Sequence, residues 1–162
     1  MIDKHIGRSL RIILLSSFIF SHLFADEIKS VNSETVALYE KFEVILEIDD
    51  SAIENPFDPD EITITARFVS PSGKEWNIVG FYDDYLGCDE WKVRFSPNEV
   101  GQWSYLVSNN SVGTLSSAEV QTFDAVASEH HGWIQVSEEN PHYFAHDDGT
   151  SFYGVGSYAP WQ

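Results

Sequence analysis

The chain has a single cysteine, Cys88, among its 162 residues. One cysteine cannot form an internal disulfide bond, which argues against a small fold held together by disulfides. Lysine and arginine are also scarce, nine against 26 Asp and Glu, and the formal net charge is −17. Such a charge repels phosphate backbones and anionic lipid surfaces, so we expect no nucleic-acid partner.

The sequence offers no hydrophobic run long enough for a membrane span of about 20 residues. The apolar run at residues 12–24 is 13 residues long and follows Lys4, Arg8 and Arg11. A basic segment before a short apolar one is typical of a secretory signal peptide. We therefore predict a signal peptide at residues 1–25, a secreted or periplasmic location, and no membrane contact after cleavage; an uncleaved anchor is the alternative. Cleavage leaves 137 residues with a formal charge of −19.

No convincing helical periodicity follows the predicted signal peptide. Apolar and polar residues instead alternate along residues 42–49, 62–69, 91–96 and 103–108, and residues 120–126 are predicted to form a further strand. This alternation predicts antiparallel strands with one buried and one solvated face. Trp91 and Trp103 lie in phase with apolar neighbours and are predicted to be core residues.

Turn signals separate the predicted strands. Ser70-Pro71-Ser72-Gly73 has proline at the second and glycine at the fourth position, the pattern of a type I turn. Several short strands with such turns predict an all-β fold, an immunoglobulin-like antiparallel β-sandwich over residues 33–127. A closed barrel is the alternative, and residues 128–132 are predicted to be a linker.

Residues 133–162 are rich in aromatic side chains and contain a second turn signal. Asp147-Asp148-Gly149-Thr150 predicts a hairpin turn, and residues 152–156 are predicted to form a buried strand. The chain ends six residues after this strand. We therefore expect these hairpin strands to begin a larger domain that is truncated in this chain.

Short motifs occur along the chain in a characteristic order. They are Tyr39-Glu40-Lys41-Phe42-Glu43, Asn55-Pro56-Phe57-Asp58, Ser70-Pro71-Ser72-Gly73-Lys74, Gly80-Phe81-Tyr82, residues 91–97 and residues 101–105. This order resembles the immunoglobulin-like N-terminal domain of unknown function in bacterial glycoside-hydrolase-like proteins. Residues 131–134, 140–144 and 148–156 are similar to the entry into the (β/α)8 barrel of those proteins, which have been described as apiosidase-like or collagen-binding.

The resemblance implies a barrel of about 250 residues, of which residues 133–162 would supply the start. Glycosidases use two carboxylates, and in the resembling proteins these come from later barrel strands, so no catalytic residue is assigned to this chain. Tyr158 and Trp161 follow the last predicted strand. In a full-length parent they would lie at the active-site face of the barrel and line a substrate subsite.

Tyr82 and Tyr85 are the candidate ligand-binding residues within the sandwich. They lie in an acidic loop, where their rings would be free to stack on a sugar. The acidic loops and the histidines lack the spacing of a metal site, so we predict no metal and no cofactor. Asp58 is predicted to cap its local backbone instead.

Together these features predict a non-catalytic N-terminal accessory module of a secreted glycoside-hydrolase-like protein that acts on carbohydrate. Its expected partner is a carbohydrate or the missing barrel domain, and the chain alone is expected to have no hydrolase activity. One alternative is a stand-alone secreted or cell-surface module that binds carbohydrate or matrix protein. The other is a decayed gene fragment.

Overall fold

A computed structural model describes residues 26–49, 51–87, 89–110, 113–114 and 119–156. The predicted signal peptide at residues 1–25 and the candidate residues Tyr158 and Trp161 lie outside this part of the chain. Within it, every regular element is a β-strand except for one turn of 3-10 helix, η1 (Tyr85–Gly87). Nothing in the described part is a helix of the length and apolarity that crossing a bilayer demands.

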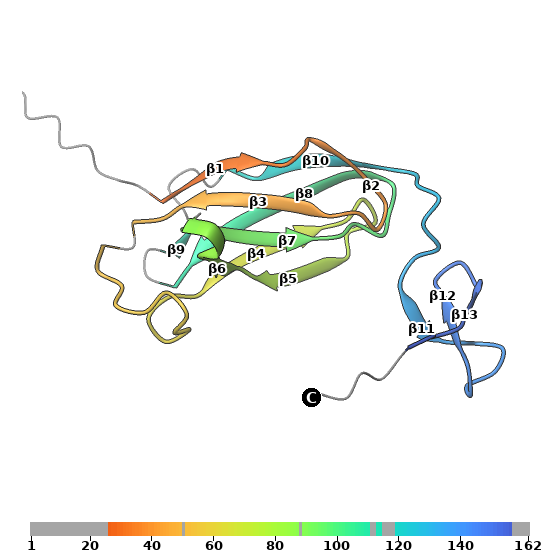
Figure 1. Ribbon diagram of the computed structural model, residues 1–162. Helices are drawn as coiled ribbons and strands as arrows, with labels where there is room; N and C mark the ends of the chain where they lie inside the picture. The colour runs from red at the N-terminus through yellow and green to blue at the C-terminus, as the bar shows by residue number, and fades with distance from the viewer. Residues whose placement is uncertain (1–25, 50, 88, 111–112, 115–118, 157–162) are drawn as a thin grey trace, which may run out of the picture.

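The first layer of the structure is a four-stranded sheet. Its strands, in spatial order, are β1 (Glu27–Val31), β3 (Phe42–Glu47), β7 (Glu90–Phe95) and β6 (Phe81–Asp83). All neighbours in this sheet pair antiparallel. The sheet lies in front of the second layer in Figure 1.

The second layer is a mixed sheet. Its spatial order is β2 (Thr35–Ala37), β10 (Gln121–Val126), β8 (Gly101–Asn109), β4 (Ile64–Val69) and β5 (Glu75–Val79), with β9 (Gly113–Thr114) also paired to β8. Strand β2 runs parallel to β10, and the other pairs are antiparallel. The two sheets have the A-B-E-D and G-F-C orders of the immunoglobulin fold. The predicted sandwich is therefore confirmed, and the alternative of a closed barrel is wrong because the layers are separate sheets.

The core lies between the two sheets and is predominantly aromatic and β-branched. Trp103, Phe42 and Phe68 are fully buried, and Trp91 is 4% exposed. The prediction that Trp91 and Trp103 are core residues is thus confirmed. The alternation of apolar and polar residues along each strand produces this core, because the inward-facing side chains of the two sheets meet between the layers.

The edge of the sandwich begins earlier in the chain than the predicted start at residue 33. Strand β1 pairs with β3, and after a short connection β2 joins the opposite sheet beside β10. The two apolar residues of β1, Ile28 and Val31, both pack against the core but lie three positions apart, because the register shifts between Ile28 and Ser30 and breaks the alternation. The sandwich strands consequently span residues 27–126.

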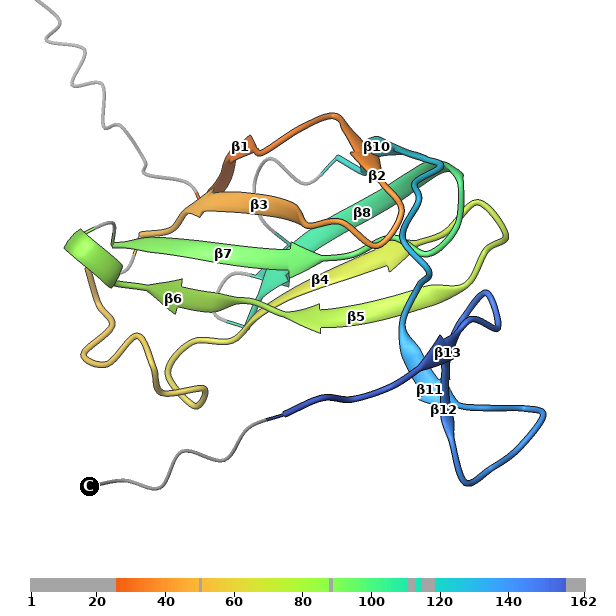
Figure 2. The ribbon, with the colours of Figure 1, turned by 45° about the vertical axis from the view of Figure 1, so that its right-hand side comes forward.

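A third, three-stranded sheet follows the sandwich and lies beyond one end of it (Figures 1 and 2). It consists of β11 (Ile134–Val136), β12 (Phe144–His146) and β13 (Ser151–Phe152). The predicted turn at residues 147–150 is confirmed, because His146 N–H donates to Thr150 O at 2.8 Å and Gly149 adopts φ +84°.

The predicted buried strand over residues 152–156 is wrong. Strand β13 ends at Phe152, and the side chains of Tyr153 and Val155 are 78% and 96% exposed. Among the described residues, no strand pairs with residues 153–156. The side chains of Tyr153 and Val155 are therefore left without packing partners in the described part of the chain.

Candidate functional site

The candidate ligand-binding residue Tyr82 lies on β6, at the edge of the first sheet. Its ring is half-buried and packs against the core residue Trp91, with 5.3 Å between the ring centroids. On its other side the exposed ring of Phe57 meets it edge-on, at 5.6 Å and 81°. Phe57 was not predicted as a ligand-binding residue. Its position after Pro56 in a loop, out of phase with any strand, is the signal in the sequence that it stays exposed.

Two hollows lie on either side of Tyr82. The first, of about 180 Å³, is mainly apolar and is lined by Phe57, Tyr82 and Trp91 together with Pro56 and Pro59. The second, of about 450 Å³, is mainly polar. Its lining includes Lys29, Glu47, Asp89 and Glu90 as well as Tyr82 and Trp91. An aromatic ring between an apolar and a carboxylate-bearing hollow suits a ligand with both a hydrophobic face and hydroxyl groups.

Trp91, which lines both hollows, carries an unused hydrogen-bond donor. Its indole N–H is buried and has no hydrogen-bond partner among the described residues. Most buried polar atoms in proteins are paired, so each exception requires an explanation. A ligand or an ordered water that reaches this N–H would satisfy it.

Tyr85 does not join Tyr82. It lies on η1, and its side chain is 73% exposed. Its backbone N–H donates to Asp83 Oδ1 at 3.2 Å, which fixes the start of the turn. Tyr85 lines neither of the two hollows, so the structure does not bring the two predicted tyrosines into one site.

An ion-pair network occupies the outer face of the first sheet near Tyr82. Lys92 Nζ lies 2.8 Å from Asp83 Oδ2 and 3.3 Å from Glu90 Oε2. The hydrogen bond with Asp83 is the main cause that raises the pKa of Lys92, and the same bond lowers the pKa of Asp83. Lys29 pairs with Glu90 at 3.1 Å and so joins β1 to β7. Both lysines are therefore paired with carboxylates.

The acidic loop at residues 54–61 uses its carboxylates within the loop. Asp58 Oδ1 accepts the Asp60 N–H at 2.9 Å, which confirms Asp58 as a backbone cap. Glu61 Oε2 accepts the N–H groups of Glu54 and Asn55 at 2.8 and 3.0 Å. Across the described ranges, no group of three or more His, Cys, Asp and Glu side chains is arranged to hold a metal ion.

The three-stranded sheet presents one apolar face, which was not predicted from the sequence. Ile134 is paired with His146, Val136 with Phe144, and Phe144 with Phe152, so all five side chains lie on the same face. Ile134, Val136 and Phe144 are each 51–55% exposed. The opposite face carries Gln135, Ala145 and Ser151. We call the first surface, formed by Ile134, Val136, Phe144, His146 and Phe152, the apolar face.

A joint connects this sheet to the sandwich. Tyr39, in the β2–β3 turn, has a positive φ of 64°, and its N–H donates to Pro97 O at 2.8 Å. Its ring meets Trp133 edge-on at 5.8 Å. Burial, followed by the nearby charge of Asp147 and a hydrogen bond to it, raises the pKa of Tyr39. Asp147 Oδ2 also accepts the Trp133 N–H at 3.1 Å.

A second contact stiffens the three-stranded sheet next to the joint. His131 Nδ1 lies 2.7 Å from Asp148 Oδ2. This hydrogen bond is the main cause that lowers the pKa of Asp148 to about 2, and Thr150 contributes further hydrogen bonds. Asp148 thus stays ionised at neutral pH and holds the start of the sheet against its hairpin turn.

Comparison with known proteins places these features in context. Residues 35–110 match the family model of a domain of unknown function, DUF5060. A crystal structure from Bacteroides vulgatus ATCC 8482, described as a "putative glycoside hydrolase", matches with a TM-score of 0.59 and 28% sequence identity over 75% of this chain and 22% of that chain. The Lin-41 filamin domain matches with a TM-score of 0.44 and 12% identity over 62% of this chain and 91% of that domain. No curated protein matches.

The match to the Bacteroides structure extends beyond the sandwich, because three quarters of this chain is more than residues 27–126 contain. The chain spans 22% of the length of that protein. The relationship supported by these comparisons is therefore to a domain of unknown function that occurs in glycoside-hydrolase-like proteins.

Proposed function

We propose that the chain is a non-catalytic accessory module that packs against the catalytic domain of a glycoside hydrolase. The observation that carries this proposal is the apolar face of the three-stranded sheet. Soluble proteins rarely expose a contiguous apolar patch unless another surface covers it. The likeness to a glycoside hydrolase over 22% of that protein's length supports the class of the partner.

The geometry of the joint suits this role. Tyr39, Trp133 and Asp147 hold the three-stranded sheet at a defined place beside the sandwich. A module fixed in this way would orient the sandwich relative to the domain that covers the apolar face. We further propose that residues 1–25 direct export, so that the module acts in a secreted or periplasmic enzyme.

Substitution of aspartate for Val136 and Phe144 tests whether the apolar face is a binding surface. The unmodified chain is expected to bind the hydrophobic dye ANS and to self-associate at high concentration, because three large side chains on this face are about half exposed. The double variant is expected to lose most of the dye fluorescence and to sediment as a monomer.

Gln135→Asp is the control, because it introduces an aspartate on the opposite face of β11, the strand that carries Val136. It is expected to leave dye binding and sedimentation unchanged. Absence of dye binding by the unmodified chain, or an equal loss in Gln135→Asp, would contradict the proposed role of the apolar face.

A second candidate function is glycan binding at the hollows beside Tyr82. Phe57 and Tyr82 offer aromatic surface, and the Trp91 N–H offers a buried donor without a protein partner among the described residues. Phe57→Ala is expected to weaken binding of soluble xylan or a cello-oligosaccharide by about tenfold in calorimetry, the scale of an exposed aromatic anchor. Tyr143→Ala, which removes an equally exposed ring from the three-stranded sheet, should have no effect. Failure of every glycan to bind saturably would reject this function.

A further inference from the structure

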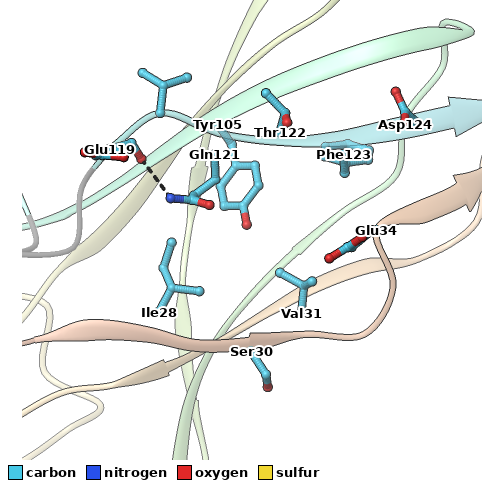
Figure 3. Close-up of a pocket in the computed structure, with 11 residues that line it drawn as sticks. Ile28, Ser30, Val31, Glu34, Tyr105, Glu119, Gln121, Thr122, Phe123 and Asp124 are labelled. Carbon is cyan, nitrogen blue, oxygen red and sulfur yellow. Dashed lines mark hydrogen bonds between the residues drawn. The ribbon is translucent and has the colours of Figure 1, made fainter.

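A groove opens on the side of the sandwich where the edge strands of the two sheets face each other. Figure 3 shows it between β1, with Ile28 and Val31, and β10, with Gln121 and Phe123. Its volume is about 540 Å³, and its lining is mostly polar. It is separate from both the hollows beside Tyr82 and the apolar face of the three-stranded sheet.

The groove is bordered by the edge strands β1 and β10, and part of the β10 edge has no partner in the described part of the chain. Strand β1 is the outermost strand of its sheet. Strand β10 is covered by β2 only at residues 124–126. On the edge of β10 that faces β2, Asp124 N–H donates to Glu34 O at 2.9 Å. Backbone N–H groups two residues apart in a strand point the same way, so the N–H of Thr122 points to this edge as well, at a position before β2 begins. An exposed strand edge of this kind is a template for a further strand.

The floor of the groove holds a polar group without a partner. Tyr105 is 4% exposed, and Figure 3 shows its hydroxyl end directed toward Ile28 and Val31. No hydrogen bond joins this hydroxyl to another residue of the described part of the chain. Burial raises the pKa of Tyr105 to about 12, so the group is a neutral donor and acceptor at physiological pH. A hydroxyl that faces an open groove and has no protein partner is available to a ligand.

The charge of the groove has one sign. Glu34 lies near one end and Glu119 near the other, and Asp124 lies on the outer side of β10 (Figure 3). None of the eleven lining residues is Lys, Arg or His. A positively charged occupant therefore complements this surface.

We propose that the groove binds an extended, basic polypeptide segment of a partner protein by strand addition to β10. The segment would continue the line of β2 and form main-chain hydrogen bonds with the free edge at Thr122. Because side chains alternate along a strand, every second residue would point inward to the Tyr105 hydroxyl and is expected to be small and polar. The residues between them would point outward and are expected to be Lys or Arg, near Glu34, Glu119 and Asp124.

A labelled peptide of alternating Lys and Thr, Lys-Thr-Lys-Thr-Lys, tests this proposal with the full chain by fluorescence anisotropy. It is expected to bind at least about tenfold more tightly than Lys-Pro-Lys-Pro-Lys, which has the same charge but lacks the strand-forming N–H groups. The charge-reversed peptide Glu-Thr-Glu-Thr-Glu is expected not to bind. The matched proline peptide separates strand addition from simple attraction to an acidic protein.

Two variants of the chain locate the binding. Thr122→Pro removes the N–H at the free edge of β10 and should weaken peptide binding about tenfold; this N–H does not pair with β8, so the sheet is retained. Thr122→Val retains the N–H and should bind the peptide normally. Tyr105→Phe removes only the unpartnered hydroxyl and should weaken binding several-fold without lowering the stability of the sandwich.

Equal affinity for the two Lys-containing peptides, or equal binding by Thr122→Pro and Thr122→Val, would overturn the proposal. Saturable binding of xylan that is lost in Tyr105→Phe, without peptide binding, would overturn it in favour of a glycan. None of these variants alters the apolar face of the three-stranded sheet, so the outcome is independent of the proposed accessory role.

Discussion

Replacing Phe68 with alanine is expected to lower the free energy of unfolding of the sandwich by about 3–5 kcal/mol, the usual range for a buried phenylalanine. The Phe68 side chain is 0% exposed and lies at the centre of the core. Its ring stacks on Phe95 at 4.2 Å and on Tyr105 at 5.6 Å, and it meets Phe42 edge-on at 6.2 Å. Alanine would remove these contacts and leave a cavity between β3, β4, β7 and β8.

Urea unfolding followed by near-UV circular dichroism measures this loss. Phe57→Ala is the matched control, because its ring is 61% exposed and its removal is expected to change stability by less than about 1 kcal/mol. Similar midpoints for the two variants would show that the aromatic cluster does not carry the stability of the sandwich.

Gly132→Ala is expected to open the joint between the sandwich and the three-stranded sheet. Gly132 has φ +92°, which is unfavourable for alanine. An added Cβ would lie 2.6 Å from Asp147 Cβ and 3.0 Å from Tyr39 Cζ. Backbone strain and overlap together are expected to cost about 2–4 kcal/mol of the closed arrangement. Tyr39 and Trp133 would then separate.

Cleavage at Glu129 by a Glu-specific protease reports on this opening, and we expect it to become about 30-fold faster or more in Gly132→Ala. Gly149→Ala serves as the control. Gly149 also has a positive φ, of 84°, but no atom lies within 4 Å of an added Cβ. Equal cleavage rates for the two variants would show that strain, rather than the tight contact at Gly132, governs the joint.

Much of the sandwich could be predicted from the sequence, because its central strands alternate strictly. Val44, Trp91 and Trp103 face the core as their phase requires. The turn at residues 70–73 was equally predictable, since Gly73 N–H donates to Ser70 O at 2.9 Å and Gly73 adopts φ +85°. Proline and glycine specify such turns locally, without help from the rest of the fold.

The remaining features depend on contacts between distant parts of the chain. Strand β1 pairs with β3 through a register shift between Ile28 and Ser30, so its own sequence does not alternate. The positive φ of Tyr39 is held by Pro97, which lies 58 residues further along the chain. The apolar face arises from the register of three very short strands, and a shift of one residue would move its side chains to the other face.

The candidate site shows the same division. Tyr82 was predicted from its place in an aromatic and acidic segment, and it does border two hollows. Tyr85 was predicted for the same reason, yet it lines neither of them. Phe57 reaches Tyr82 only because the loop after β3 folds back over the edge of the sheet, which no local pattern indicates.

Amide hydrogen exchange tests most directly whether the apolar face meets a catalytic domain. The isolated chain is compared with a chimaera, the Bacteroides vulgatus protein with its matching segment replaced by residues 26–156 of this chain. Covering three half-exposed apolar side chains is expected to stabilise the three-stranded sheet by about 3 kcal/mol. The amides of β11 and β12 are therefore expected to exchange about 100-fold more slowly than in the isolated chain. Strands β3 and β8 should exchange equally in both. Equal exchange of β11 and β12 in the two settings, or the same slowing with Val136→Asp and Phe144→Asp, would contradict the proposed accessory role.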